Sequence, residues 1–279
     1  MSYSKEKNKC LIYKNDLKFN NNLNLQESEF ESDNIKLMYN NFKNKPKIEL
    51  RIEDSKIENY AYLDLSKLEI DDLHLLKLFK LKIIIDLLKQ IEFLDLSNNN
   101  LTQLPDLFNY PNILYLNVSF NNIEQHILDN NLIELTCHNN KIKSIKSDKL
   151  THLSASNNQI DLLDIPEIKI LIISYNNLNW IPNYINLKYL ECIQNQINKI
   201  DNMLELEELY IGNNNLVSIK NMPKLKILNC VNNPINKINY FPKLKTLMSS
   251  ITKISSQYIV SNISKVKSEY LINFDVEIL

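Results

Sequence analysis

The sequence predicts an elongated, mostly β solenoid in which short stacked repeats each contribute one strand to a parallel sheet. Three observations predict it: an eleven-residue pattern that recurs at a nearly constant period, an asparagine at one place in almost every copy, and connections too short to hold a helix. A fixed period of roughly 20 residues is typical of repeat proteins, in which each unit contacts only its neighbours.

The repeated pattern is clearest in IEFLDLSNNNL, residues 91–101, which carries apolar residues at its positions 1, 4, 6 and 11. Eight further copies follow, and the nine units start at residues 91, 113, 132, 150, 168, 187, 206, 225 and 244. Positions 4 and 6 alternate with polar neighbours, which is typical of a strand with one buried side. Each unit is too small to bury its own apolar side, so we expect stability to come from stacking on neighbouring units.

Position 9 of the pattern is asparagine in every unit except the last, where Thr252 takes its place. The column comprises Asn99, Asn121, Asn140, Asn158, Asn176, Asn195, Asn214 and Asn233. Because an asparagine amide both donates and accepts hydrogen bonds, we expect a structural ladder that satisfies backbone groups where the chain leaves each strand. The chain has a single glycine, Gly212, so we also expect asparagine to make the turns that need a positive φ.

These units resemble the leucine-rich-repeat family, whose motif is LxxLxLxxN/CxL, and the resemblance covers residues 91 to about 260. It implies a short-repeat, intracellular solenoid of the right-handed β-α superhelix class, with a parallel β-sheet on its concave face. After the first unit, only seven or eight residues separate successive patterns, which is too few for an α-helix with two connections. We therefore expect an extended or 3₁₀ convex side.

Four segments are expected along the chain. Residues 1–45 form a polar Asn/Lys-rich arm, partly disordered or folded as a small hairpin and helix. Residues 46–90 form an N-terminal cap, with a degenerate repeat at 60–70 and a helix over 71–90 that Asp71 or Asp72 caps. The nine repeats fill residues 91–254, and residues 255–279 form a C-terminal cap. The solenoid is thus preceded by a small α+β segment.

The composition gives no reason to expect an enzyme. The formal net charge is -1 and no segment has the continuous apolar core of a signal peptide or membrane span, so we expect no nucleic acid, no membrane and a cytoplasmic location. A chain with one glycine cannot form a glycine-rich phosphate loop. Cys137, Cys192 and Cys230 occupy the buried position 6, and His138 and His152 lie at opposite ends of adjacent strands. We therefore expect no catalytic residue, metal, cofactor or small-molecule substrate.

The outward positions of the strands carry aromatic, aliphatic and mostly acidic side chains, which is typical of a surface that binds another protein. We expect the concave face to bind a partner protein through Phe93, Asp95, Tyr115, Glu134, His152, Ile170, Ile172, Tyr175, Tyr189, Glu191, Glu208 and Tyr210. The sequence therefore predicts a non-enzymatic interaction scaffold or adaptor. Two alternatives stay open: a structural or virion-associated component, and a ubiquitin-ligase adaptor with a degenerate F-box in the N-terminal arm.

Overall fold

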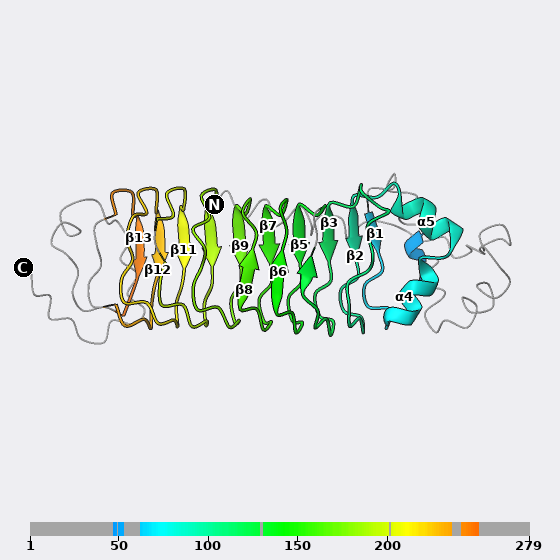
Figure 1. Cartoon of the computed structure of the whole chain (residues 1–279), viewed down its shortest axis with the longest axis horizontal. Coiled ribbons are helices and arrows are strands. Elements are labelled where there is room, and N and C mark those ends of the chain that lie inside the picture. The colour runs from blue at the N-terminus through cyan, green and yellow to red at the C-terminus, as the bar shows by residue number, and fades with distance from the viewer. Residues whose placement is uncertain are drawn as a thin grey trace, which may run out of the picture.

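The computed structural model describes residues 47, 48, 50–52, 62–128, 131–200, 202–235 and 241–250. The predictions for the polar arm over 1–45, the C-terminal cap over 255–279 and position 9 of the last unit lie outside the described residues. Within the described residues, short strands recur at the repeat period, and extended connections join the strands into a long solenoid (Figure 1).

Ten parallel strands form one sheet along the length of the described chain (Figure 1). The strands are β1 (Tyr62–Asp64), β2 (Phe93–Asp95), β3 (Tyr115–Asn117), β5 (Glu134–Thr136), β7 (His152–Ser154), β9 (Ile170–Ile172), β10 (Tyr189–Glu191), β11 (Glu208–Tyr210), β12 (Ile227–Asn229) and β13 (Thr246–Met248). Neighbours in this order are hydrogen-bonded, so the sheet follows the chain. β1 comes from the degenerate repeat, and the other nine strands are positions 3 to 5 of the nine units.

Equivalent positions of neighbouring units lie opposite one another in this sheet. Leu190, at position 4 of its unit, pairs in register with Leu171 on one side and Leu209 on the other. The side chain at position 4 is at most 2% exposed in all ten strands. Stacking of equivalent positions therefore buries a continuous aliphatic column, which is the main stabilising contribution in a solenoid of this kind.

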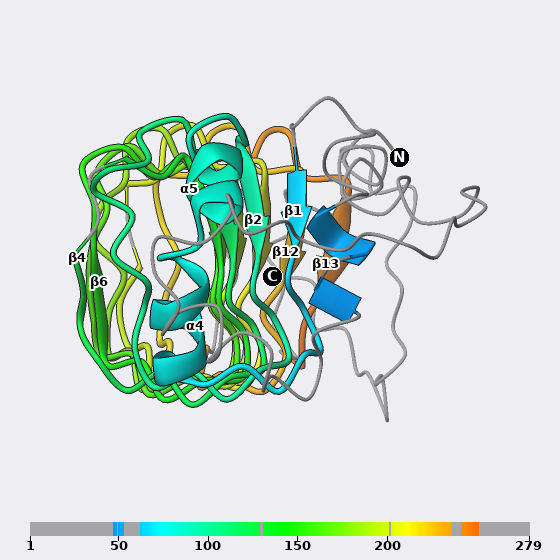
Figure 2. The ribbon, with the colours of Figure 1, turned by 90° about the vertical axis from the view of Figure 1, so that its right-hand side faces the viewer.

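A three-stranded parallel sheet covers part of the opposite side of the core. Its strands are β4 (Ile127–Leu128), β6 (Ser144–Lys146) and β8 (Leu162–Asp164). Figure 2 shows β4 and β6 across the core from β1, β2, β12 and β13. Ile145 and Leu163 pair in register there and are 1% and 4% exposed, so they close the core from this side. The outer side is extended, as the short connections predict.

Asn176 shows which hydrogen bonds the asparagines at position 9 make. Its Oδ1 accepts from the N–H of Ile160 (2.9 Å), and its Nδ2 donates to the carbonyls of Ala155 (3.0 Å) and Ile173 (3.1 Å). The other seven asparagines of the column make the equivalent three bonds. Each amide therefore joins two successive units and satisfies backbone groups inside the turn.

Position 8, one residue before this asparagine, is left-handed wherever the structure describes it, with φ between 53° and 58°. Asparagine occupies it in five units, but Phe120, Tyr175 and Gln194 occupy it in three others and Lys67 in the degenerate repeat. The expectation that asparagine alone makes these turns is therefore wrong. Hydrogen bonds of the stacked units fix the turn, so a side chain that disfavours a positive φ adopts it nevertheless.

Two short helices follow β1, whereas the sequence predicts one helix over 71–90. The region is helical, but the expected continuity is wrong. A turn separates α4 (Asp72–Leu78) from α5 (Lys82–Leu88). The buried side chains here are Ile83, Leu88 and a row spaced by three residues, at Leu75, Leu78, Leu81, Ile84 and Leu87. In a straight α-helix, a row with this spacing would rotate by about 60° at each step and leave the core. The break between the helices keeps the row on the core.

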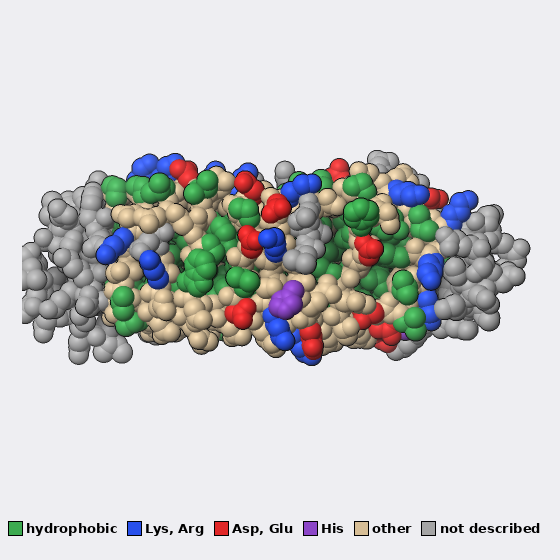
Figure 3. Space-filling view, viewed as in Figure 1, with side chains coloured by type: hydrophobic (Ala, Val, Ile, Leu, Met, Phe, Trp, Pro, Cys, Tyr) green, Lys and Arg blue, Asp and Glu red, His purple; other side chains and the backbone are tan. Residues whose placement is uncertain are grey.

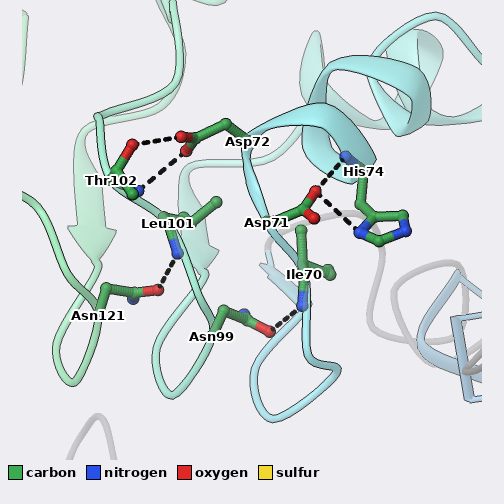
Figure 4. A network of polar contacts seen from close by, with 8 residues as sticks. All are labelled: Ile70, Asp71, Asp72, His74, Asn99, Leu101, Thr102 and Asn121. Atoms are coloured by element: carbon green, nitrogen blue, oxygen red, sulfur yellow. Dashed lines mark hydrogen bonds and ion pairs between the residues drawn. The ribbon is translucent and has the colours of Figure 1, made fainter.

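Side-chain hydrogen bonds fix the start of α4 to the neighbouring unit (Figure 4). Asp71 is the N-cap, because its Oδ1 accepts from the backbone N–H of His74 at 2.8 Å. Asp72 accepts from the backbone N–H and the hydroxyl of Thr102, at 3.0 Å and 2.5 Å. The helix is therefore held both by its own cap and by the first complete repeat.

Candidate protein-binding face

The outward side chains of the ten-stranded sheet form one continuous surface, which we call the long-sheet face. It consists of positions 3 and 5 of the ten strands: Tyr62, Asp64, Phe93, Asp95, Tyr115, Asn117, Glu134, Thr136, His152, Ser154, Ile170, Ile172, Tyr189, Glu191, Glu208, Tyr210, Ile227, Asn229, Thr246 and Met248. All of these residues are partly exposed except Asp64 and Asp95, which are buried. They alternate with the buried position 4, so the pleat of the strand presents them outward.

Fixed charge on the long-sheet face has one sign. Its carboxylates are Asp64, Asp95, Glu134, Glu191 and Glu208, and none of its twenty positions is lysine or arginine. On the opposite side, over β4, β6 and β8, basic and acidic side chains lie interspersed (Figure 3). A positively charged ligand therefore meets mainly carboxylates on the long-sheet face and mixed charge on the other side.

Eleven of the twelve residues predicted to bind a partner lie on the long-sheet face. The exception is Tyr175, which lies in the left-handed turn after β9 and is 54% exposed. Asp95 lies on the face but is only 9% exposed, and its Oδ1 accepts from the N–H of Ser97 at 2.8 Å. Burial raises the pKa of Asp95. This carboxylate therefore offers a partner less surface than its strand position predicts.

The β10–β11 group, which we define as Tyr189, Glu191, Glu208 and Tyr210, alternates tyrosine and glutamate in both directions. Tyr189 lies opposite Glu208, and Glu191 lies opposite Tyr210. The hydroxyl of Tyr189 donates to Oε2 of Glu191 (3.1 Å), and the hydroxyl of Tyr210 donates to Oε2 of Glu208 (3.2 Å). Burial and then the glutamate charges raise the pKa of Tyr210 to about 12 and also raise that of Tyr189. Both hydroxyls therefore remain donors at neutral pH.

A similar pair of strands lies at the other end of the sheet, and we call it the β1–β2 group. It consists of Tyr62 and Asp64 on β1 with Phe93 and Asp95 on β2, in register. The ring of Tyr62 stacks on that of Phe93, with centroids 5.0 Å apart and an interplanar angle of 15°. Each strand of both groups therefore carries one aromatic and one acidic side chain two residues apart.

A leucine-rich repeat protein is among the known proteins that this chain resembles. No protein-family model matches the sequence. A putative leucine-rich repeat protein of Acanthamoeba polyphaga mimivirus, R380, is 33% identical over 120 residues, which are 40% of this chain and 28% of that protein. The match thus spans less than a third of the relative's length.

Solved structures share the architecture. The crystal structure of the LRIM1/APL1C complex matches with a TM-score of 0.57 at 19% identity, over 68% of this chain and 45% of that chain. The leucine-rich repeat domain of APL1B matches with a TM-score of 0.54 at 23% identity, over 71% of this chain and 62% of that one. The chain has the fold of a leucine-rich-repeat solenoid. At these identities the likeness to the solved structures concerns the fold alone.

Cysteine and histidine side chains of the solenoid have structural roles. Cys137, Cys192 and Cys230 are buried at position 6, as predicted, and burial raises the pKa of each thiol. His138 reaches the next unit, where the hydroxyl of Ser154 lies 2.7 Å from its Nε2.

In the part of the chain that the structure describes, no three His, Cys, Asp or Glu side chains are grouped to hold a metal ion. No described helix of the solenoid is long and apolar enough to span a membrane.

Sequence reasoning missed a basic residue that reaches the long-sheet face from a segment outside the repeats. Arg51, from the short helical segment 50–52 that lies beside β1 (Figure 2), places its Nη1 2.7 Å from Oδ2 of Asp64. The side chain of Asp64 is 5% exposed, so this ion pair compensates a buried charge. Arg51 is the only arginine of the chain, and its being unique is the one feature of the sequence that could have drawn attention to it.

Proposed function

We propose that the solenoid is a non-enzymatic interaction scaffold that binds a protein partner across the long-sheet face. The partner presents apolar and basic side chains, which complement the aromatic, aliphatic and acidic residues of this face. We also propose a cytoplasmic location, which suits the three unpaired thiols of the core.

The observation that carries the proposal is the continuity of partly exposed apolar side chains over adjacent strands. Ile170 lies beside Tyr189, Ile172 lies beside Glu191, and the rings of Tyr189 and Tyr210 are 5.6 Å apart. Large side chains that are already partly buried lose little conformational entropy on binding. Tyrosine is among the residues that dominate binding energy at interfaces. One of the similar solved structures is itself a complex, of LRIM1 with APL1C, which supports a protein partner by analogy.

Removal of the two central tyrosine rings tests the proposal. We expect the Tyr189→Ala/Tyr210→Ala chain to lose most of the partner that the wild-type chain recovers from its native cell, in affinity purification quantified by mass spectrometry. The matched control is Phe108→Ala/Trp180→Ala, which removes two aromatic side chains that are 82% and 53% exposed outside the long-sheet face. This control should recover the partner as the wild type does.

Equal recovery by the tyrosine variant and the wild type, with both chains folded by circular dichroism, would exclude the long-sheet face as the binding surface. Equal loss in both double variants would also contradict the proposal, because it would show that any exposed aromatic pair matters as much as this one.

A further inference from the structure

The β1–β2 group shows how this chain binds a basic side chain on the long-sheet face. Arg51 pairs with Asp64 at 2.7 Å. Asp64 lies on the same strand as Tyr62, whose ring stacks on that of Phe93. Burial and then the charge of Asp64 raise the pKa of the Tyr62 hydroxyl, and the positive charge of Arg51 lowers it. The chain has 32 basic residues, and its single arginine is the one placed there. An aromatic surface next to a carboxylate suits a guanidinium, which can stack on the ring and donate hydrogen bonds to the oxygens together.

The β10–β11 group presents the same kinds of side chain in a symmetrical arrangement. Its two carboxylates lie on the diagonal of a rectangle whose sides are one strand spacing, about 4.8 Å, and two residues, about 6.6 Å. The two tyrosine rings occupy the other diagonal, and each hydroxyl holds one oxygen of a neighbouring glutamate. The hydroxyl of Ser174 donates to Oε1 of Glu191 at 3.3 Å, which fixes that carboxylate further. The acceptors are therefore oriented before any ligand arrives.

Neighbouring carboxylates differ from this group in having lysine partners. Glu205 and Glu207, in the connection that leads into β11, pair with Lys224 at 2.6 Å and Lys226 at 2.5 Å. Among the residues that the structure describes, no lysine or arginine forms an ion pair with Glu191 or Glu208. The chain therefore neutralises carboxylates in this connection and leaves two oriented carboxylates between tyrosine rings on the face.

We propose that the β10–β11 group binds the guanidinium of an arginine side chain from a protein partner, an inference that rests on the proposed function of the long-sheet face. The guanidinium lies over the tyrosine rings and donates to both glutamates. In the β1–β2 group, Arg51 already pairs with one carboxylate, that of Asp64. The bound arginine comes from another kind of protein. Because Arg51 is the only arginine of the chain and already pairs with Asp64, neither this chain nor a second copy of it can supply one.

Fluorine NMR of the full-length chain labelled with 3-fluorotyrosine tests the proposal, with Tyr189→Phe and Tyr210→Phe chains used to assign the two resonances. The probe is N-acetylarginine amide, and its neutral isostere N-acetylcitrulline amide is the comparison. We expect saturable shifts of both resonances with the arginine compound and none with citrulline. Nα-acetyllysine amide, which keeps its side-chain ammonium, should bind at least about tenfold more weakly than the arginine compound. An ammonium cannot bridge both carboxylates while stacking on a ring.

Two charge-matched variants locate the site. Glu191→Gln/Glu208→Gln keeps an oxygen acceptor for each tyrosine hydroxyl and should weaken arginine binding at least about tenfold. Glu205→Gln/Glu207→Gln removes the same charge from the connection that leads into β11. It should leave the affinity for arginine within about twofold of the wild type, since those carboxylates already have lysine partners. Equal binding of arginine and citrulline by the wild type overturns the proposal whether or not the variants fold. Equal binding of lysine, or equal weakening by the two variants, overturns it as well.

The outcome is separable from that of the proposed function. If Glu191→Gln/Glu208→Gln recovers the cellular partner as the wild type does, while Tyr189→Ala/Tyr210→Ala does not, the arginine site fails and the interaction face stands. If neither variant affects recovery, the proposed function fails, and the citrulline comparison still decides whether the group recognises a guanidinium.

Discussion

At the scale of single residues, the asparagine column carries the polar half of the core. Asn176 supplies three hydrogen bonds to backbone groups of two units and is 7% exposed. An apolar side chain of similar size could fill the same space but could not make these bonds. Unpaired backbone groups in a buried turn cost more than the bonds themselves contribute, because their desolvation is then uncompensated.

Asn176→Leu should therefore lower the free energy of unfolding by about 1–3 kcal/mol, measured by urea denaturation followed by circular dichroism. The adjacent Asn177, which is exposed, provides the control, and Asn177→Leu should change stability by less than about 0.5 kcal/mol. Equal effects of the two substitutions would show that the column is not a special structural position.

The aromatic residues at position 8 are under backbone strain. Phe120 has φ 57° and is 54% exposed, so burial of its ring offsets the cost of this conformation only in part. Phe120→Asn should raise the free energy of unfolding by about 1 kcal/mol, because asparagine tolerates the left-handed region best among residues other than glycine. Thermal unfolding checks this, and Phe108→Asn, at an exposed position with no positive φ, should give no gain. A lower melting temperature for Phe120→Asn would mean that the ring itself stabilises the turn.

The position of a residue could be predicted where it follows from the repeat register. Its backbone conformation could not be predicted where it opposes the residue's own φ preference. The pattern placed the eight asparagines and the buried cysteines in the correct columns, since register alone fixes them. It could not place Phe120 or Tyr175 in the left-handed region, because their own preferences argue against it and only the stacked units impose it. The register predicts a surface position for Asp95, because strand alternation does not show that the carboxylate is buried and accepts from the N–H of Ser97.

At the scale of elements, the spacing of the buried residues in α4 and α5 matches two short helices and not one straight helix. The sequence was rich in leucine and isoleucine with capping aspartates, which predicts helix, and helix is what forms. The break at residues 79–81 was missed because no glycine or proline marks it. Its cause is the three-residue spacing of the buried side chains, which one straight helix cannot keep on the core.

Asp71→Ala should lower the free energy of unfolding by about 1 kcal/mol, because α4 loses the side-chain acceptor for the backbone N–H of His74. The control is Asp86→Ala, which removes an exposed carboxylate within α5 that caps nothing. Denaturant midpoints of the two variants and the wild type decide the matter. A destabilisation by Asp86→Ala as large as that by Asp71→Ala would mean that net charge, and not the cap, accounts for the effect.

At the scale of the whole molecule, a solenoid must cover the ends of its core. Figure 2, which looks along the solenoid, shows α4 and α5 over its end, and Leu78, Leu81 and Ile84 are at most 1% exposed there. Without these helices, the apolar side of the first complete repeat would face water.

A chain truncated to residues 91–279 should therefore associate or aggregate, as seen by size-exclusion chromatography with light scattering. Deletion of the internal segment 187–205 removes one whole unit and keeps both ends, so that chain should remain in the oligomeric state of the wild type. A truncated chain that behaves as the wild type in chromatography and melts at the same temperature would contradict the capping role of α4 and α5.

The positions and side-chain types of the long-sheet face could be predicted almost completely from the repeat, but the contact that Arg51 makes with it could not. Positions 3 and 5 follow from the register, whereas the pairing of Arg51 with Asp64 joins a segment outside the repeats to the first, degenerate strand. Nothing periodic connects these two residues. That ion pair nevertheless gives the clearest indication of what the face can bind.

The central claim is that a partner protein covers the long-sheet face, and photo-cross-linking in the native cell tests it most directly. A photoreactive phenylalanine at Ile172 on β9 would lie on this face, and one at Leu162 on β8, which is 55% exposed, would lie across the core. The account predicts a discrete cross-linked product from position 172 and none from position 162. A product from position 162 alone would contradict it.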